Sequence, residues 1–310
     1  MKARRFKQVD VFGVAAYLGN PLAVVLDGSE LSEQDMQHFA NWTNLSETTF
    51  VLAPSQAGAA AGADYRARIF TPGAELPFAG HPTLGSCHAW LEAGGSPQAD
   101  KIIVQECAAG LIRIRRDGAR LGFAAPALRR GTPAPGLLAQ VAGALGLKTY
   151  QIRASQLLDN GPVWLGLLLD CRQTVLQLTP DHLALKNLGQ KIGVVAIEDA
   201  ASAAMLIARS NREARASSTN SNVPINTSTL PLVEVRAFAA AVGVNEDPVT
   251  GSLNASLAQW LIADGHAPDN YIAAQGSCLG RAGRVYIDSG DGQVWVGGDS
   301  VTCMEGTVNL

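Results

Sequence analysis

Apolar and polar residues alternate over many short stretches of the chain, and residues typical of turns separate these stretches. Alternation of this kind predicts half-buried β-strands. Longer stretches place apolar residues three or four positions apart, which predicts helices. In the helix expected at 31–43, Met36 and Phe39 share one face. Ser32 is the expected N-cap, since the acidic Asp35 follows three residues later.

The pattern predicts strands and helices in mixed order along the chain. Strands are expected at 6–12, 21–26, 48–54, 64–72, 101–107, 111–116, 120–126, 162–170, 192–199, 203–210, 232–239, 270–276, 283–289 and 292–298. Helices are expected at 31–43, 82–95, 135–146, 179–192 and 249–265. Thr179 is the expected cap of the helix at 179–192, and the Gly-Asn-Pro turn at 19–21 is expected to join the first two strands. The polar segment 211–230 is expected to be a loop.

One arrangement occurs twice. "GHPTLGSCHA" begins at Gly80 and "EDPVTGSLNA" at Glu246, and each follows a strand that contains an Arg-x-Phe pattern. When His81 is aligned with Asp247, 166 residues later, a proline, a glycine, a serine and an alanine also coincide. Repetition at half the chain length predicts that one α+β unit is present twice. The segment 125–136, rich in proline and arginine, is the expected linker and hinge between two domains.

Composition and charge argue against several classes of protein. Hydrophobic residues make up 47% of the 310 residues and charged residues 16%, which predicts folded cores rather than disorder. The net charge of −3 gives no basic footprint for nucleic acid. No apolar run reaches the roughly 18 residues that a membrane span needs, and the N-terminal apolar stretch is broken by a turn signal. We therefore expect a soluble cytoplasmic protein with no nucleic-acid and no membrane partner.

The five cysteines are scattered, odd in number and without a C-x-x-C pair, which argues against a disulfide framework and a structural zinc site. The sequence has no cluster of residues at metal-ligand spacing and no glycine-rich nucleotide fingerprint after a strand. We therefore expect no metal and no organic cofactor. Cys87 is expected to pack in the core, and Arg68 and Arg236 are expected to brace strands near the cleft.

The repeated unit places titratable residues where helices are expected to begin. A first helical turn presents unpaired N–H groups and the positive end of the helix dipole. Two such ends that face one another across a cleft stabilise a carboxylate or a developing enolate. His81 and Asp247, one in each first turn, would then stand on opposite sides of a substrate. Glu47 in "NLSETTF" lies where a loop meets a strand and is a candidate general base.

Five motifs occur together in this order: "GNPLAVV", "LSETTFV", "ELPFAGHPTLG", "EDPVTGS" and "QGSCLGRAGRV". With them the chain resembles the phenazine-biosynthesis PhzF-like proteins, which belong with the diaminopimelate epimerase superfamily. The resemblance runs from about Val9 to Gly298. The chain departs from the pattern at Val249 and Leu253, where the family more often has alanine, and the acid–base residues are not affected.

The resemblance implies an α+β fold of two similar domains, each a curved, barrel-like mixed sheet around a central helix, with the active site between them. The N-terminal domain is expected to span residues 1–128, completed by a C-terminal strand at 299–310. The second domain is expected to span residues 129–298. The resemblance also suggests a homodimer.

The resemblance implies catalytic roles for Glu47, His81 and Asp247. In PhzF-like proteins the glutamate of the "SET" motif, here Glu47, carries the proton. The histidine of "GHPT" and the aspartate of "DPxTGS" line the same pocket, at positions where the epimerases have cysteines. The residues expected to bind substrate are Gly80, Gly251, Ser252, Gln275 and Gly276.

We therefore expect a cofactor-independent isomerase that moves a proton on a small carboxylated metabolite. Glu47 would take the proton from one carbon and return it elsewhere, while His81 and Asp247 hold the substrate. Two alternatives stay open. A two-base racemase or epimerase of an amino or hydroxy acid is disfavoured by the lack of the cysteine pair. A small-molecule binding protein without turnover would not need a proton carrier.

Overall fold

The computed structural model describes residues 1–198, 231–290 and 292–310. The strand expected at 203–210 and the loop expected at 211–230 lie outside these residues. The strands are β1 (Ala3–Val11), β2 (Asn20–Val25), β3 (Thr48–Leu52), β4 (Tyr65–Phe70), β5 (Glu75–Leu76), β6 (Ile102–Cys107), β7 (Gly110–Asp117), β8 (Arg120–Ala124), β9 (Arg129–Gly131), β10 (Ile152–Asp159), β11 (Val163–Leu169), β12 (Lys191–Ile197), β13 (Val233–Ala239), β14 (Val244–Asp247), β15 (Asn270–Gln275), β16 (Gly283–Gly290), β17 (Gln293–Gly298) and β18 (Ser300–Asn309). The α-helices are α1 (Glu33–Thr43), α2 (Gln56–Ala60), α3 (Gly80–Glu92), α4 (Pro135–Leu145), α5 (Arg172–Gln177), α6 (His182–Leu188) and α8 (Gly251–Ala263).

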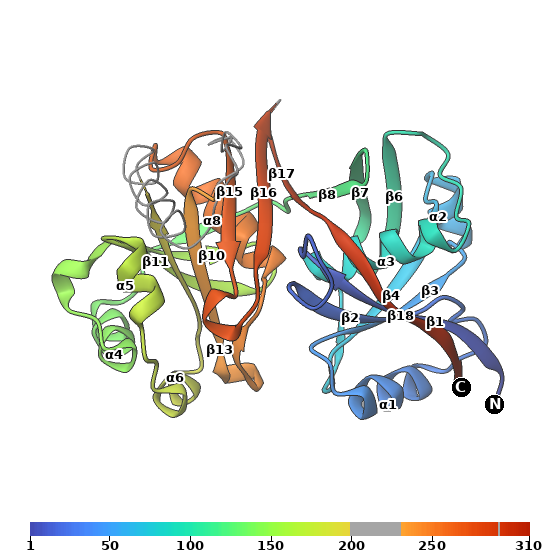
Figure 1. Ribbon diagram of the computed structural model, residues 1–310, viewed down its shortest axis with the longest axis horizontal. Helices are drawn as coiled ribbons and strands as arrows, with labels where there is room; N and C mark the ends of the chain where they lie inside the picture. Colours follow the sequence, from blue (N-terminus) through green and yellow to red (C-terminus); the bar gives the residue numbers. More distant parts are fainter. Residues whose placement is uncertain (199–230, 291) are drawn as a thin grey trace, which may run out of the picture.

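The strands form two groups with the same pairing pattern, which we call the N-terminal and the C-terminal lobe (Figure 1). In the N-terminal lobe the order is β18-β1-β2-β3-β4-β6-β7-β8, with parallel pairs β2–β3 and β4–β6. In the C-terminal lobe it is β9-β10-β11-β12-β13-β15-β16-β17, with parallel pairs β11–β12 and β13–β15. The antiparallel pair β8–β17 joins the lobes. The α+β unit expected to occur twice is therefore visible in the strand order, while the domain boundary at 128/129 stays a prediction.

Each lobe is built around one helix, α3 or α8, which leads into the second strand of a parallel pair. Both helices have 13 residues, and nine residues in each are buried. Half of these buried positions are glycine, alanine, serine or cysteine, because the surrounding strands approach closely. Gly85 shows how little room there is: a Cβ there would lie 2.6 Å from Leu22 and 2.8 Å from Val11.

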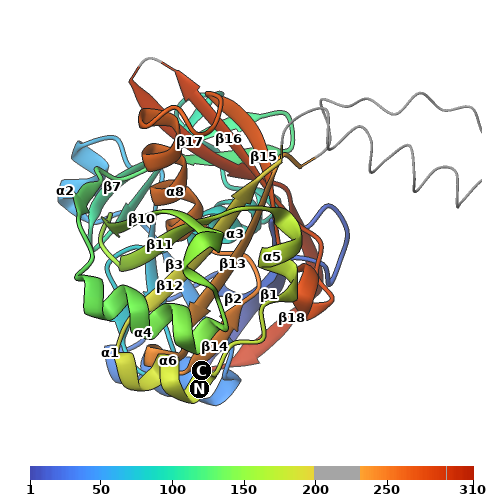
Figure 2. The same ribbon diagram turned by 90° about the vertical axis from the view of Figure 1, so that its left-hand side faces the viewer.

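A second apolar core lies on the outer face of the C-terminal lobe, where α4, α5 and α6 cover the sheet (Figure 2). The strand β11 contributes to both cores. Leu165 and Leu167 face this outer core, whereas Trp164 and Leu168 face the inner one. Burial on both faces explains the continuous apolar run at this strand, which was correctly expected to be buried.

The two central helices are not related by the same offset as the two sequence motifs. The central helices begin at Gly80 and Gly251, which are 171 residues apart, rather than the 166 that separate His81 from Asp247. The two "Pro-x-x-Gly-Ser" motifs therefore do not occupy equivalent places. His81 lies in the first turn of α3, as expected, whereas Asp247 ends the strand β14, four residues before α8. The expectation that Asp247 lies in a first helical turn was wrong.

Several local expectations can be compared with the structure. The capping box of Ser32 and Asp35 is confirmed. Thr179 does not cap the following helix: Asp181 does so by accepting from the N–H of Ala184, because α6 starts only at His182. The segment 125–136 contains the short strand β9. The sequence pattern did not predict α2, β5, β10, α5 or β14.

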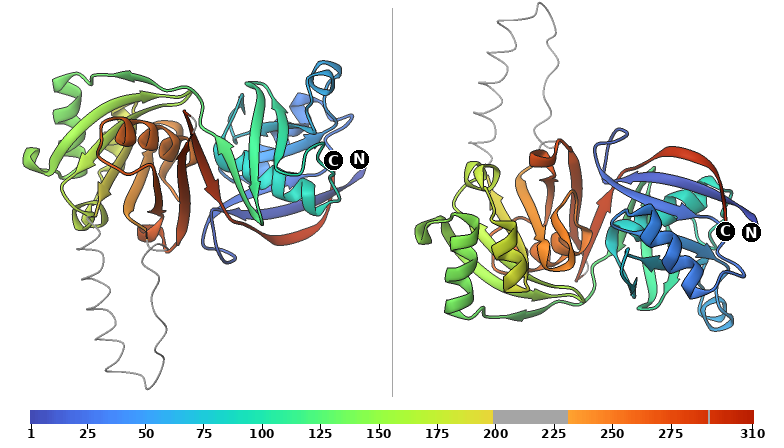
Figure 3. Two further views of the ribbon diagram at one scale, coloured as in Figure 1. Left: turned by 90° about the horizontal axis from the view of Figure 1, so that it is seen from above. Right: turned by 90° about the horizontal axis from the view of Figure 1, so that it is seen from below.

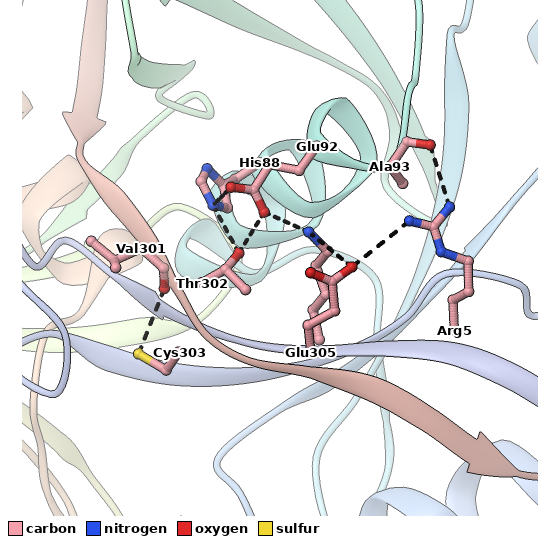
Figure 4. A network of polar contacts seen from close by, with 9 residues as sticks. Arg5, His88, Glu92, Ala93, Val301, Thr302, Cys303 and Glu305 are labelled. Carbon is pink, nitrogen blue, oxygen red and sulfur yellow. Dashed lines mark hydrogen bonds and ion pairs between the residues drawn. The ribbon is translucent and has the colours of Figure 1, made fainter.

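The last strand returns to the N-terminal lobe, where β18 pairs with β1 (Figure 3). Figure 4 shows how this strand is tied to α3. Thr302 donates to the carboxylate of Glu92 at 2.6 Å and lies 3.1 Å from Nε2 of His88. Lys7 of β1, whose side chain is 4% exposed, donates to the same Glu92 carboxylate at 2.6 Å. The helix that carries His81 is thereby fixed to both ends of the chain.

The two central helices approach so closely that only glycine fits where they meet. A Cβ built on Gly80 would lie 3.0 Å from Cα of Gly251 and 2.8 Å from the ring of Phe123. We therefore expect Gly80→Ala to lower the free energy of unfolding by about 1–3 kcal/mol, because the helices must separate. Chemical denaturation measures this.

Gly143→Ala is the matched control, because nothing lies within 4 Å of a Cβ at this position inside α4. Alanine there should stabilise the protein by about 0.5–1 kcal/mol through its helix propensity. Equal effects of the two substitutions would show that the close helix contact does not constrain position 80.

Candidate active site

Three of the expected residues come together from three separate segments. Glu47 directly precedes β3, His81 is the second residue of α3, and Asp247 is the last residue of β14. Nε2 of His81 lies 3.4 Å from Oε2 of Glu47, and the two side chains are only 6% and 17% exposed. Neither of these two atoms completes a hydrogen bond with any residue that the structure describes. Both atoms therefore keep a hydrogen-bonding capacity that no described residue uses.

Asn20 joins His81 to Asp247. Its Nδ2 donates to Oδ1 of Asp247 at 3.0 Å and to the carbonyl of Val249 at 2.9 Å, and lies 3.4 Å from Nδ1 of His81. The other carboxylate oxygen of Asp247 accepts from the hydroxyl of Thr250 at 2.5 Å. Both oxygens of Asp247 are thus held, whereas Oε2 of Glu47 is not.

The two helix N-termini supply a positive potential at this place. Gly80 and Gly251 are in contact, and neither helix has a side-chain cap. The first N–H groups of a helix have no partner within the helix, so the N–H groups of Gly80, His81, Gly251 and Ser252 remain available. Together with the helix dipoles they favour an anion.

Ser252 lies beside this junction in the first turn of α8. Its hydroxyl accepts from Nε1 of Trp164 at 3.2 Å, and its carbonyl accepts from Nδ2 of Asn160 at 2.9 Å. These contacts orient Ser252 from the adjoining strand β11 and from the residue after β10. No arrangement of a histidine and an acid around Ser252 resembles a serine nucleophile within the described residues.

The side chain of Gln275 supports the segment that leads into α8. Its side chain is fully buried, and its Oε1 accepts from the N–H of Thr250 and from Asn254. Its Nε2 donates to the carbonyl of Asp247 and to the hydroxyl of Thr250. With these hydrogen bonds Gln275 holds the start of α8, and the substrate contact expected from the sequence stays a prediction.

Backbone geometry explains why glycine occupies position 276. Its φ is +93°, and a Cβ there would lie 2.7 Å from the carbonyl oxygen of Pro248. A side chain would clash with the segment that leads into α8, and the positive φ favours glycine. This geometry accounts for Gly276 without a contact to substrate.

Burial raises the pKa of Glu47 to about 7, and the Ser46 hydroxyl and the Lys191 charge only partly oppose this. Removal from water disfavours the charged carboxylate. At neutral pH this side chain is therefore close to half protonated. A carboxyl group with such a pKa both accepts and releases a proton readily at physiological pH.

Burial shifts the pKa values of His81 and Asp247 in opposite directions. Burial lowers the pKa of His81 to about 4, against the attraction of Asp247 and Asp10, so the imidazole is neutral at pH 7. Burial and the nearby charge of Glu47 raise the pKa of Asp247 to about 6. Groups whose surroundings shift their pKa values so strongly are typical of catalytic sites.

The sequence reading missed three supporting residues. Asn20 was interpreted only as part of a turn, yet it begins β2 and is 1% exposed. Lys191 was assigned to the end of a helix, yet it begins β12, and its charge acts on Glu47. Thr250 was passed over within "DPVTGS". For Asn20, the signal was the amide side chain within the "GNPLAVV" motif.

Two further expectations concern residues outside the reacting centre. Cys87 is fully buried, and burial raises the pKa of its thiol to about 12, so its place in the core is confirmed. Arg68 pairs with Glu75 across β4 and β5, and Arg236 pairs with Glu246 across β13 and β14. Both arginines brace the strands that lead to the central helices.

No group of three or more potential metal ligands occurs in the described part of the chain.

Comparison with known proteins identifies the family of this chain. The profile of the family described as "Phenazine biosynthesis-like protein" matches residues 9–306. The chain belongs to this family. It is 33% identical to "Antisense-enhancing sequence 1" of Schizosaccharomyces pombe, over 99% of each chain. It is 32% identical to the trans-2,3-dihydro-3-hydroxyanthranilate isomerase of Pseudomonas aeruginosa, again over 99% of each chain.

Solved structures share this fold. The PhzF-family protein of Bacillus anthracis covers 100% of both chains with a TM-score of 0.78 and 22% identity. A probable proline racemase of Agrobacterium radiobacter covers 99% of this chain and 93% of its own, with a TM-score of 0.58 and 13% identity. The family member described here thus has the epimerase-like α+β fold and is an enzyme of the isomerase class. No helix among its described residues is long and apolar enough to cross a membrane.

The raised pKa of Glu47 predicts a pH-dependent cost to the fold. A carboxyl group titrates near 4.5 when it is exposed and at about 7 here, so stability is lost as the pH rises from about 4.5 to 7. Glu47→Gln removes this cost. We expect the substitution to stabilise the protein by about 2–3 kcal/mol more at pH 8 than at pH 5, measured by denaturation at both pH values. A stability difference that does not change with pH would contradict a buried, perturbed carboxyl group.

Proposed function

We propose that this family member is a cofactor-independent isomerase that moves a proton between two carbons of a small carboxylated metabolite, with Glu47 as the proton carrier. The observation that carries the proposal is the carboxyl group of Glu47, which is buried, has a pKa of about 7 and has one oxygen without a partner among the described residues. Isomerases among the relatives support the reaction class.

The reaction balances without an oxidant or reductant. The carboxylate of Glu47 takes a proton from a carbon of the substrate, and the electron pair of the broken C–H bond moves into the adjoining π-system. The O–H bond of Glu47 then breaks as a C–H bond forms at a second carbon. Negative charge develops on the substrate in between, and it would be stabilised by the N–H groups at the starts of α3 and α8.

The neighbouring side chains have supporting roles in this proposal. His81 is neutral at pH 7 and acts as a fixed polar partner for Glu47 and the substrate. Asp247 is held by Asn20 and Thr250 through both of its oxygens. Lys191, whose charge acts on Glu47, adds to the positive potential that favours an anionic substrate.

A two-base racemase is a second candidate, because the pKa of Asp247 is also raised, to about 6. Its geometry is less suitable. The hydrogen bonds from Asn20 and Thr250 stabilise the carboxylate of Asp247 and make it a weaker base, whereas Oε2 of Glu47 accepts no hydrogen bond from the described residues. The unpartnered Oε2 of Glu47 therefore favours a single proton carrier.

The first experiment identifies the substrate. The protein is incubated in deuterated water with a panel of small carboxylates that includes trans-2,3-dihydro-3-hydroxyanthranilate, the substrate named for one relative. Protein-dependent uptake of deuterium into carbon, followed by NMR or mass spectrometry, is the expected result for at least one compound.

With that compound, Glu47→Gln should lower turnover by about 10²–10⁴-fold, because the amide keeps the size and polarity of the side chain but cannot take the proton. Binding of the compound should change only a few-fold. Asp247→Asn and His81→Asn should weaken binding more and the chemical step less. A Glu47→Gln protein with most of its activity, together with an inactive Asp247→Asn protein, would transfer the base to Asp247 and favour the racemase.

A further inference from the structure

Asn20 begins β2, and its side-chain amide contacts three groups at the candidate active site. The residue is 1% exposed, and its Nδ2 approaches three acceptors: the carbonyl of Val249 at 2.9 Å, Oδ1 of Asp247 at 3.0 Å and Nδ1 of His81 at 3.4 Å. His81 belongs to α3, Asp247 ends β14, and Val249 lies between β14 and α8. One amide nitrogen thus contacts both His81 and Asp247.

The chemistry of the amide fixes what His81 can do. An asparagine Nδ2 donates two hydrogens and does not accept. The presence of two oxygen acceptors at 2.9 and 3.0 Å fixes the orientation of the amide, because the opposite orientation would bring Oδ1 against oxygens. A hydrogen on Nδ1 of His81 would therefore point at another donor. The favourable state leaves Nδ1 with its lone pair and places the hydrogen on Nε2.

We propose that Asn20 is a positioning residue that holds His81 in the tautomer with the hydrogen on Nε2, the ring atom that lies beside Glu47. Nε2 lies 3.4 Å from Oε2 of Glu47. The inference rests on the proposed function only in assigning this face of His81 to the reacting centre. A structural role alone, in which Asn20 ties β2 to the start of α8, makes no demand on the tautomer.

The tautomer has a consequence for the reaction. An Nε2 that already carries a hydrogen has no lone pair for a proton from Glu47. The proton that Glu47 takes from the substrate therefore stays on Glu47 until it is returned to carbon. Asn20 thereby keeps His81 a hydrogen-bond donor and prevents it from serving as a second proton carrier.

The test needs no substrate. Protein labelled with ¹⁵N-histidine is studied at pH 7.5 by long-range ¹H–¹⁵N correlation spectra, which distinguish protonated from unprotonated ring nitrogens. The His81 signals are assigned by their loss in His81→Asn. We expect Nε2 protonated and Nδ1 unprotonated in the natural protein. A hydrogen on Nδ1 would overturn the proposal.

Two substitutions test the cause. Asn20→Asp puts an oxygen acceptor in the place of Nδ2 and should move the hydrogen to Nδ1, while Asn20→Ala should leave a mixture of both tautomers. Asn160→Ala is the matched control, because this buried asparagine holds Ser252 and has no contact with His81. Circular dichroism selects the folded variants, and the Asn20→Ala protein serves if Asn20→Asp does not fold.

The outcomes separate this proposal from the proposed function. If His81 kept its hydrogen on Nε2 in folded Asn20 variants, Asn20 would not set the tautomer, whatever the turnover of the protein. If Asn20→Ala released the tautomer while Glu47→Gln left turnover unchanged, the positioning role would stand and the role of Glu47 as proton carrier would fail.

Discussion

The arrangement of this protein depends on the contact between the starts of α3 and α8. Two helices that run into one another at their N-termini bring together partial positive charges and unpaired N–H groups, which repel one another unless an anion or acceptor lies nearby. Glycine at positions 80 and 251 allows the backbones to approach within a distance that any side chain would prevent. The pairing of β8 with β17 and the return of β18 to β1 hold the lobes in this position.

The same contact explains the electrostatics of the site. Side chains around it are removed from water, so burial disfavours their charged forms and shifts Glu47, His81 and Asp247 toward neutrality. The fold thus keeps two carboxyl groups with raised pKa values and a neutral histidine next to two positive helix ends. Burial of these three side chains lowers the stability of the folded protein. In the proposed reaction, charge that develops on the substrate would meet N–H donors that are already in position here.

Much of this could be predicted from the sequence. The buried run at β11, the capping box of Ser32 and the presence of the two central helices follow from local rules about period, caps and turns. The proximity of Glu47, His81 and Asp247 came from the resemblance to a family, because no local rule connects residues so far apart in the chain. The register of the repeat was misjudged for a physical reason: matching motifs need not occupy matching positions when the loops before them differ in length.

Asn20 and Gln275 show the other limit of sequence reasoning. Both are buried amides whose role depends on which backbone and side-chain atoms surround them, and that arrangement exists only in the folded protein. The sequence predicts a turn residue at Asn20 and a ligand contact at Gln275, and neither prediction includes these hydrogen bonds. A side chain with several donors and acceptors can support a site or line it, and the hydrogen-bond partners decide between these roles.

The central claim is that Glu47 is a buried carboxyl group with a pKa near neutrality, and it can be measured without knowledge of the substrate. Protein labelled with ¹³C at glutamate carboxyl carbons is titrated by NMR, with the Glu47 signal identified by its absence in Glu47→Gln. The account predicts a midpoint at about 7. A midpoint close to the ordinary value of about 4.5 would contradict it.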